Sequence, residues 1–221
     1  MDSRPGARAV HAITFAVAAF AVVFQLVLVV QGHSPLAPEL RPSTGEAVRR
    51  FFSYFTIQSN VLVAVTALAP AIGRGVDSRW WAVARLAAVV GITVTGVVHL
   101  LLLRPILHLA GVDWWADLLL HAVVPVLALV GWLVLGPRGR AERGDVAPAL
   151  AWPVLWLVAT LALGPVLHWY PYPFLDVSKH GLGSVVLVCL AVAVLFVGLA
   201  LGAVALDRRL SAPAEVVPVR P

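Results

Sequence analysis

Long apolar stretches alternate with short polar connections along most of the chain. A helix needs about 20 mainly apolar residues to cross a bilayer. Six stretches meet this requirement, and they cover residues 9–31, 50–72, 82–103, 114–135, 149–169 and 182–206. The connections between them are rich in Gly, Pro and Arg, which are typical of turns and helix ends. The pattern predicts an all-α fold, an integral membrane bundle of six transmembrane helices.

The composition excludes an ordinary soluble domain. Hydrophobic residues make up 61% of the chain and charged residues only 12%, and the mean hydropathy is +0.93. A soluble domain carries about twice that charged fraction. The lone Cys189 lies in an apolar stretch, so an intrachain disulfide and a cysteine metal site are both excluded. We expect the bilayer as a partner and no nucleic acid, because the basic residues lie at helix ends rather than in one patch.

The distribution of basic residues predicts the orientation of the helices. If the N-terminus lies inside, eleven of the sixteen Lys and Arg residues fall on the inner side and five on the outer side. Cytoplasmic loops carry such an excess, so both termini are predicted to be cytoplasmic. The first apolar stretch is longer than the core of a signal peptide, which has about 7–15 residues, and we interpret it as a retained helix.

A single domain is expected over residues 1–206. Residues 207–221 carry Pro213, Pro218 and Pro221 and are predicted to form a disordered cytoplasmic tail. Fifteen of the basic residues are Arg and one is Lys, and Ala, Val and Gly are abundant. This usage is typical of GC-rich coding, so we expect a bacterial protein in the cell (plasma or inner) membrane.

The second apolar stretch begins with an unusually polar segment, FFSYFTIQSN at residues 51–60. A helix turns about 100° per residue, so Ser53, Thr56 and Asn60 share one stripe of a continuous helix, and Ser59 lies beside it. A polar stripe in lipid is costly unless it faces protein or a water-filled cavity. The segment is therefore predicted to line a site.

Other polar residues are predicted to lie at the same depth. Thr56 is seven residues from Arg49, and His121 is seven residues from Trp114, so each lies about 10 Å below the outer end of its helix. His99 is five residues from the outer end of the third helix. The same half of the bundle also receives Asp117, Tyr170, Tyr172, Asp176 and His180. Polar groups at one depth on separate helices indicate a site.

These residue types permit nucleophilic catalysis. A hydroxyl nucleophile needs a base within hydrogen-bond distance, and a third group that fixes the tautomer of the base. Thr56, His121 and either Asp117 or Asp176 supply these three parts. Asn60, Ser59, or the hydroxyl of Tyr170 or Tyr172 could donate to a developing oxyanion. This chemistry requires no metal and no cofactor.

Other hypotheses explain the same residues. Thr56 could bond only to the carbonyl four residues earlier, and Asn60 could only join two helices. The polar residues would then line the cavity of a non-enzymatic carrier or partner protein. Alternatively, His99 and His121 could be the axial ligands of a haem, since imidazole pairs commonly have this role.

Three segments resemble a known family. They are FFSYFTIQSN at 51–60, DLLLHAVVP at 117–125 and WYPYPFLD at 169–176. In their order they are similar to segments of the androgen-induced family of multi-pass membrane proteins, and closest to its bacterial branch, which is named for its prolines and six helices ("Pr-six-Pr"). The resemblance spans roughly residues 9–206. The family includes threonine hydrolases that cleave fatty-acid esters of hydroxy fatty acids (FAHFA hydrolases).

The resemblance implies a role for individual residues. The nucleophile of the family would fall on Thr56 and its catalytic histidine on His121, while the Tyr-Pro-Phe element of the family would fall on residues 172–174. The segment after Thr56 reads Ile-Gln-Ser-Asn here, which departs from the animal enzymes. The resemblance thus implies a hydrolase of lipid metabolism, acting on a lipid or fatty-acyl ester within the membrane.

Overall fold

Helices account for all the regular structure in the part of the chain that the structure describes. The computed structural model describes residues 5–34, 36 and 41–211. Within these ranges no strand forms, and six helical segments are long and apolar enough to cross a membrane. They are Pro5–Val30, Phe55–Ile72, Arg79–Ile106, Gly111–Leu135, Arg143–Leu167 and Val177–Ser211. The predictions of an all-α fold and of a multi-pass membrane protein are confirmed.

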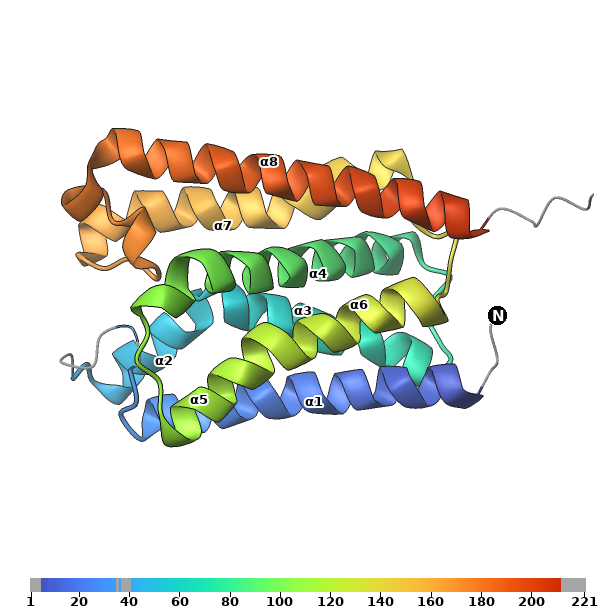
Figure 1. Cartoon of the computed structure of the whole chain (residues 1–221), viewed down its shortest axis with the longest axis horizontal. Helices are drawn as coiled ribbons and strands as arrows, with labels where there is room; N and C mark the ends of the chain where they lie inside the picture. Colours follow the sequence, from blue (N-terminus) through green and yellow to red (C-terminus); the bar gives the residue numbers. More distant parts are fainter. Residues whose placement is uncertain (1–4, 35, 37–40, 212–221) are drawn as a thin grey trace, which may run out of the picture.

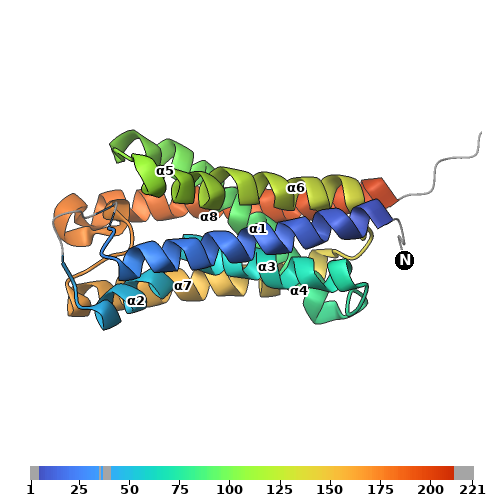
Figure 2. The same cartoon turned by 90° about the horizontal axis from the view of Figure 1, so that it is seen from below.

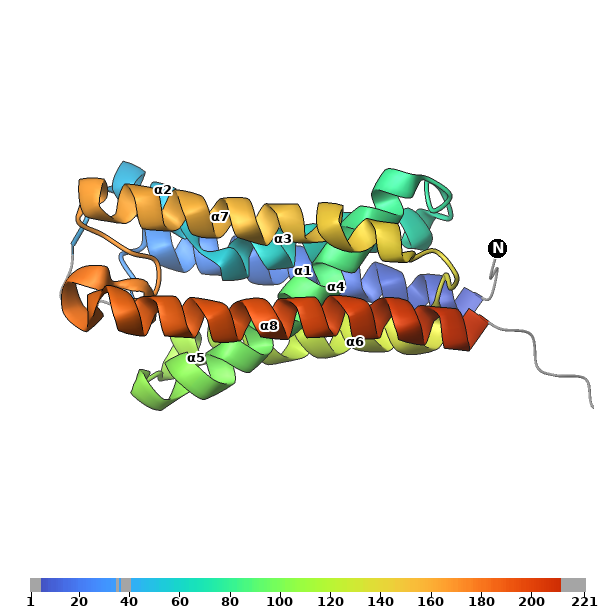
Figure 3. The same ribbon diagram turned by 90° about the horizontal axis from the view of Figure 1, so that it is seen from above.

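The long helices run roughly along one axis, with α4 between two groups of helices. Figure 1 shows α7 and α8 side by side on one side of α4, with α1, α3 and the rod of α5 and α6 on the other. In Figures 2 and 3, α1 and α6 cover one face of the bundle, and α7 and α8 cover the opposite face. The bounds are α1 (Pro5–Val30), α3 (Phe55–Ile72), α4 (Arg79–Val98), α5 (Gly111–Leu118), α6 (Val124–Leu135), α7 (Val146–Leu167) and α8 (Val177–Ser211).

The start of α1 and the end of α8 lie at the same end of the bundle (Figure 1), which we call the terminal end. The opposite end, which we call the site end, carries the short helix α2 (Thr44–Ser53) and the first turn of α3. Ser43 caps α2, because its hydroxyl accepts a hydrogen bond from the backbone N–H of Glu46 (3.4 Å). Residues 44–48, which lie in a connection between two of the apolar stretches, are therefore helical.

The structure breaks the helix that the sequence predicts to be continuous over residues 50–72. Tyr54 is extended (φ −70°, ψ 128°), so α2 ends at Ser53 and α3 begins at Phe55. The indole N–H of Trp156 donates to the backbone carbonyl of Ser53 (2.9 Å), while the N–H of Ile57 bonds to Tyr54 instead (3.1 Å). A side chain of α7 thus replaces the helical hydrogen bond to Ser53. The stripe expected to join Ser53 to Thr56 and Asn60 is interrupted as a result.

The last helix is longer than the sequence indicates. Residues 207–211, predicted as part of a disordered tail, continue α8 as a helix, and residues 212–221 lie outside the described residues. Asp207 explains the extension, because it is 4% exposed and accepts hydrogen bonds from the backbone N–H groups of Arg140 and Ala141 (2.9 Å each). A buried carboxylate that accepts two backbone N–H groups ties the last turn of α8 to the connection between α6 and α7.

Aromatic packing joins α3 to α7 and α8. The ring of Phe55 stacks on Trp152 (4.4 Å between centroids) and meets the edges of Trp156 (5.2 Å) and Phe196 (5.8 Å). Gly91 of α4 lies directly beneath this cluster, since a Cβ atom there would come within 2.9 Å of the Trp152 ring. Small residues allow this close approach, which is the main source of helix association in a membrane.

We expect Gly91→Ala to destabilise the fold, by about 1–3 kcal/mol, because the added methyl group overlaps the Trp152 ring and displaces the stack on Phe55. The measurement is the thermal unfolding midpoint of the purified protein in detergent. Gly198→Ala is the matched control, since a Cβ at Gly198 of α8 meets nothing within 4 Å. Equal midpoints for the two variants would contradict this account of the packing.

Candidate functional site

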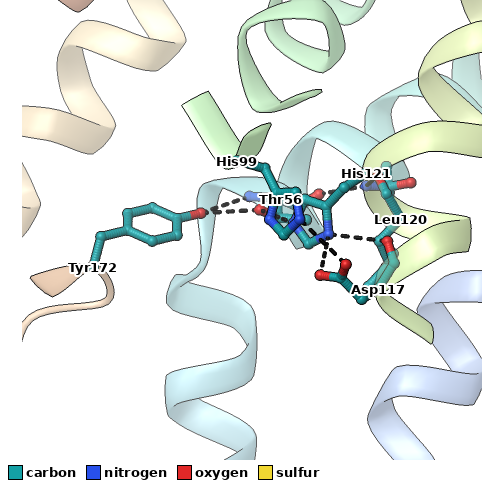
Figure 4. Close-up of polar contacts among 7 residues, drawn as sticks. Thr56, His99, Asp117, Leu120, His121 and Tyr172 are labelled. Carbon is teal, nitrogen blue, oxygen red and sulfur yellow. Dashed lines mark hydrogen bonds and ion pairs between the residues drawn. The ribbon is translucent and has the colours of Figure 1, made fainter. Parts of the chain in front are cut away.

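Four segments of the site end bring polar side chains together around Thr56. Thr56 lies in the first turn of α3, and His121 lies in the π-helical segment η3 (Leu119–Val123) between α5 and α6. His99 begins a second π-helical segment, η1 (His99–Leu103), which follows α4. Tyr172 comes from the connection between α7 and α8. Figure 4 shows Thr56 between Tyr172 on one side and His121 on the other.

Thr56, His121 and Asp117 form a continuous hydrogen-bond chain. Nδ1 of His121 is 3.0 Å from Oδ1 of Asp117, and Nε2 of His121 is 3.3 Å from Oγ1 of Thr56. A carboxylate only accepts hydrogen bonds, so Nδ1 carries the proton and Nε2 is the acceptor. The hydroxyl of Thr56 must then donate to His121. This is the arrangement of a hydroxyl nucleophile, a base and an orienting acid.

The hydroxyl of Tyr172 completes the chain on the other side of Thr56. It lies 3.1 Å from Oγ1 of Thr56 and accepts a hydrogen bond from the backbone N–H of Thr56 (3.0 Å). Since the proton of Thr56 is directed to His121, the hydroxyl of Tyr172 donates to Oγ1. Burial raises the pKa of Tyr172, so the phenol remains a donor at neutral pH. Oγ1 of Thr56 therefore receives a hydrogen bond as well as giving one.

Asp117 also binds a second imidazole. Nε2 of His99 is 3.2 Å from Oδ2 of Asp117, and the rings of His99 and His121 stack with centroids 3.8 Å apart and an angle of 14° between their planes. Each carboxylate oxygen thus has its own imidazole partner. A buried carboxylate is stable only when it is paired and hydrogen-bonded, and the two imidazoles fulfil this condition.

Both histidines lie in π-helical segments, and a proline follows two residues after the end of each segment. Pro125 has no N–H to donate to the carbonyl of His121 four residues earlier, and Pro105 cannot donate to Leu101. The carbonyl of His121 also lies against Gly96 of α4, where a Cβ atom would come within 3.3 Å of it. π-Helical turns occur frequently at functional sites. The two prolines are the sequence signal for these turns.

The ligand atoms of His99, Asp117 and His121 all lie within 4.8 Å of one another, so these residues could approach one metal ion. A histidine that binds a metal normally donates its other ring N–H to a partner. Nδ1 of His99 is buried and has no hydrogen-bond partner among the described residues. Both oxygens of the Asp117 carboxylate are nevertheless paired with an imidazole nitrogen already, at 3.2 and 3.0 Å, as in a hydrogen-bond network. The rings also face the same carboxylate, so they do not have the opposed geometry of haem axial ligands.

The structure gives a different role to two residues predicted as oxyanion donors. Asn60 is fully buried, and its amide group donates to the carbonyls of Thr56 (2.8 Å) and Leu120 (3.3 Å). Ser59 donates to the carbonyl of Phe55 (2.8 Å) and accepts from Thr95 (3.1 Å). Their donors are occupied, so both residues hold α3 against its neighbours. Asn60 thereby fixes the segment of His121 relative to Thr56.

Four other predicted site residues lie away from Thr56. Ser53 donates to the carbonyl of Arg49 (2.9 Å) within α2, and the ring of Tyr170 lies against Gly164 of α7. Asp176 accepts from the N–H of Ser178 (3.0 Å), and His180 is exposed. Of the two candidates to orient His121, Asp117 is hydrogen-bonded to it, whereas Asp176 is bonded to Ser178. Tyr172, rather than Tyr170, supplies the phenol.

Two cavities meet at Thr56. One cavity has a volume of about 190 Å³ and reaches Arg50 and Trp169 at the site end. Most of its wall is apolar, but we call it the polar cavity because Asp117 and His121 lie in its wall. The apolar cavity has a volume of about 160 Å³ and lies between α4, α7 and α8. Thr56, His99, Leu103 and Tyr172 belong to the walls of both cavities. Sequence reasoning included a polar cavity among its alternatives, but it missed the apolar cavity, which depends on how α7 and α8 pack.

Charged and aromatic residues order the rim of the polar cavity. The guanidinium groups of Arg49 and Arg50 lie over the Trp169 ring, 5.3 and 5.1 Å from its centroid. Glu46 accepts hydrogen bonds from both, at 2.6 and 2.7 Å. The hydrogen bond from Arg49 lowers the pKa of Glu46 to about 2, so the carboxylate stays ionised. The amphipathic helix α2 is thereby held over the cavity.

No protein-family model, no curated protein and no solved structure matches the chain. The geometry of the site is therefore the ground for a functional assignment. It places a hydroxyl group, an oriented imidazole and a phenol in one hydrogen-bond chain beside two cavities.

We expect Asp117→Asn to reverse the tautomer of His121, because the amide of Asn can donate to Nδ1 as well as accept. The ¹⁵N chemical shifts of the histidine side chains report which ring nitrogen carries the proton. In the unmodified protein, His121 should be protonated on Nδ1. Asp176→Asn is the control and should leave the His121 signals unchanged; a shift caused by that variant would contradict the assignment of Asp117 as the orienting group.

Proposed function

We propose that the protein is an intramembrane lipid-ester hydrolase that uses Thr56 as its nucleophile and His121 as its base. The observation that carries the proposal is the chain from Asp117 through His121 to Thr56, with distances of 3.0 and 3.3 Å. The resemblance to the androgen-induced family supports the same roles for Thr56 and His121. Both termini are assigned to the cytoplasm by the charge distribution, which puts the site in the outer leaflet of the cell membrane.

The first half of the reaction transfers the acyl group to the enzyme. His121 removes the proton of Thr56 as the oxygen attacks the ester carbonyl carbon, and Asp117 stabilises the imidazolium. The phenol of Tyr172 donates to the oxygen atoms that carry negative charge in the transition state. Thr56 also lies in the first turn of α3, where the positive end of the helix dipole favours an anion. His121 then protonates the departing alcohol.

The second half releases the acid. A water molecule from the polar cavity gives a proton to His121 and attacks the acyl-enzyme. The bond to Thr56 breaks, and His121 returns the proton to the threonine oxygen. The substrate reaches the site from the bilayer, so the class of substrate is a lipid or fatty-acyl ester and the metabolic setting is that of membrane lipids.

A fluorophosphonate probe, which reacts with activated hydroxyl nucleophiles, should label the protein in membranes. Labelling should be lost in Thr56→Ala, which lacks the nucleophile, and in His121→Ala, which lacks the base. Thr66→Ala is the matched control, because its hydroxyl bonds within α3 (2.8 Å to the carbonyl of Leu62). Labelling of Thr56→Ala at the level of the control would refute the enzymatic role, and a carrier would give no labelling in any form.

Tyr172→Phe should lower kcat for a p-nitrophenyl ester by about 100-fold, with little change in KM, since it removes one preorganised donor. The measurement is steady-state hydrolysis by the purified variant in detergent, at matched thermal stability. Tyr170→Phe serves as the control, because that ring packs against Gly164 and not against Thr56. An equal loss in both variants would argue against a specific role of Tyr172.

A further inference from the structure

The two cavities beside Thr56 differ in chemistry. The polar cavity includes Asp117 and His121, which lie in no part of the wall of the apolar cavity. Beyond the four residues that the cavities share, the apolar wall has few polar side-chain atoms. Thr95 donates to Ser59, the indole of Trp156 donates to Ser53, and Cys189 carries the single thiol of the chain. The remaining wall is aliphatic or aromatic.

The position of His121 determines which part of an ester can occupy which cavity. In the proposed reaction, His121 gives its proton to the departing alcohol and later accepts one from water. Both groups must therefore lie on the His121 side of the carbonyl carbon, which is the side of the polar cavity. The acyl chain must leave the carbonyl carbon in another direction. The apolar cavity is the other space that opens at Thr56.

We propose that the apolar cavity between α4, α7 and α8 binds the acyl chain of the substrate, while the polar cavity receives the alcohol. This inference rests on the proposed function and makes it more specific. The new element is the side of the site at which each part of the ester lies: the length of the acid is sensed in the apolar cavity and that of the alcohol in the polar cavity. The acyl group stays in the apolar cavity between the two halves of the reaction.

The bond changes balance with water as the only co-reactant. The bond between Oγ1 of Thr56 and the carbonyl carbon forms, the bond from that carbon to the alcohol oxygen breaks, and the proton moves from Thr56 through His121 to the alcohol. Water then forms the new bond to carbon, the bond to Thr56 breaks, and a proton of the water returns through His121 to Oγ1. The products are one alcohol and one carboxylic acid.

Three substitutions of Ala by Trp test the assignment of the cavities. Ala193 lies in the wall of the apolar cavity and Ala47 in the wall of the polar cavity, whereas Ala191 of α8 belongs to neither. Each variant is assayed with two ester series, p-nitrophenyl esters of acetate to laurate and decanoate esters of methanol to decanol.

Ala193→Trp should reduce the ratio of kcat/KM for decanoate over acetate by about tenfold or more, because the indole occupies the space of the chain. Ala47→Trp should leave that ratio unchanged and alter the dependence on alcohol length. Ala191→Trp should behave like the unmodified protein in both series. If Ala193→Trp changes only the alcohol dependence, the assignment is reversed and the inference is wrong.

Cys189 gives a second readout that needs no turnover. In Thr56→Ala, a p-nitrophenyl decanoate ester should slow the alkylation of Cys189 by N-ethylmaleimide, and the acetate ester should not. Protection without hydrolysis in the unmodified protein would support the acyl cavity and refute the hydrolase. Hydrolysis with neither protection nor selectivity for acyl length would support the hydrolase and refute the acyl cavity.

Discussion

The carboxylate of Asp117 is the interaction on which the site depends. A charge in the interior of a membrane protein is costly unless hydrogen bonds satisfy it. One oxygen of Asp117 accepts from His121 and the other from His99, so the charge draws η1 and η3 together. The stacked rings then leave Nε2 of His121 directed at Thr56. Removal of the charge would affect the position of η1 relative to η3, and also the position of the proton on the His121 ring.

Irregular backbone supplies the geometry that regular helices do not offer. The π-turns at His99 and His121 and the extended residue Tyr54 lie at the same end of the bundle. Each of these irregular turns frees or redirects a backbone carbonyl, and other groups of the protein bond to several such carbonyls. The amide group of Asn60, for example, donates to the carbonyls of Thr56 and Leu120. Such irregularity is tolerated at membrane depth only where it is buried in protein or lines a cavity.

Hydrophobic pattern alone predicted the six membrane helices, because lipid solvent requires long apolar segments and imposes few other conditions. Depth along the helices also brought Thr56 and His121 to the same level, and the structure brings them into contact. Sequence could not separate Asp117 from Asp176, since that choice depends on where the connection between α7 and α8 places Asp176, which bonds to Ser178 instead. It also missed the break at Tyr54, which depends on Trp156, about one hundred positions later.

That distance along the chain has a consequence for biogenesis. Membrane proteins are made from the N-terminus, so residues 44–72 leave the ribosome well before Trp156 and Tyr172 exist. Until α7 arrives, no indole occupies the carbonyl of Ser53, and the segment is free to remain one straight helix with Thr56 away from its phenol partner. The hydrogen bonds around Thr56 are therefore completed last. A nascent or truncated chain lacks the phenol that the proposed reaction requires.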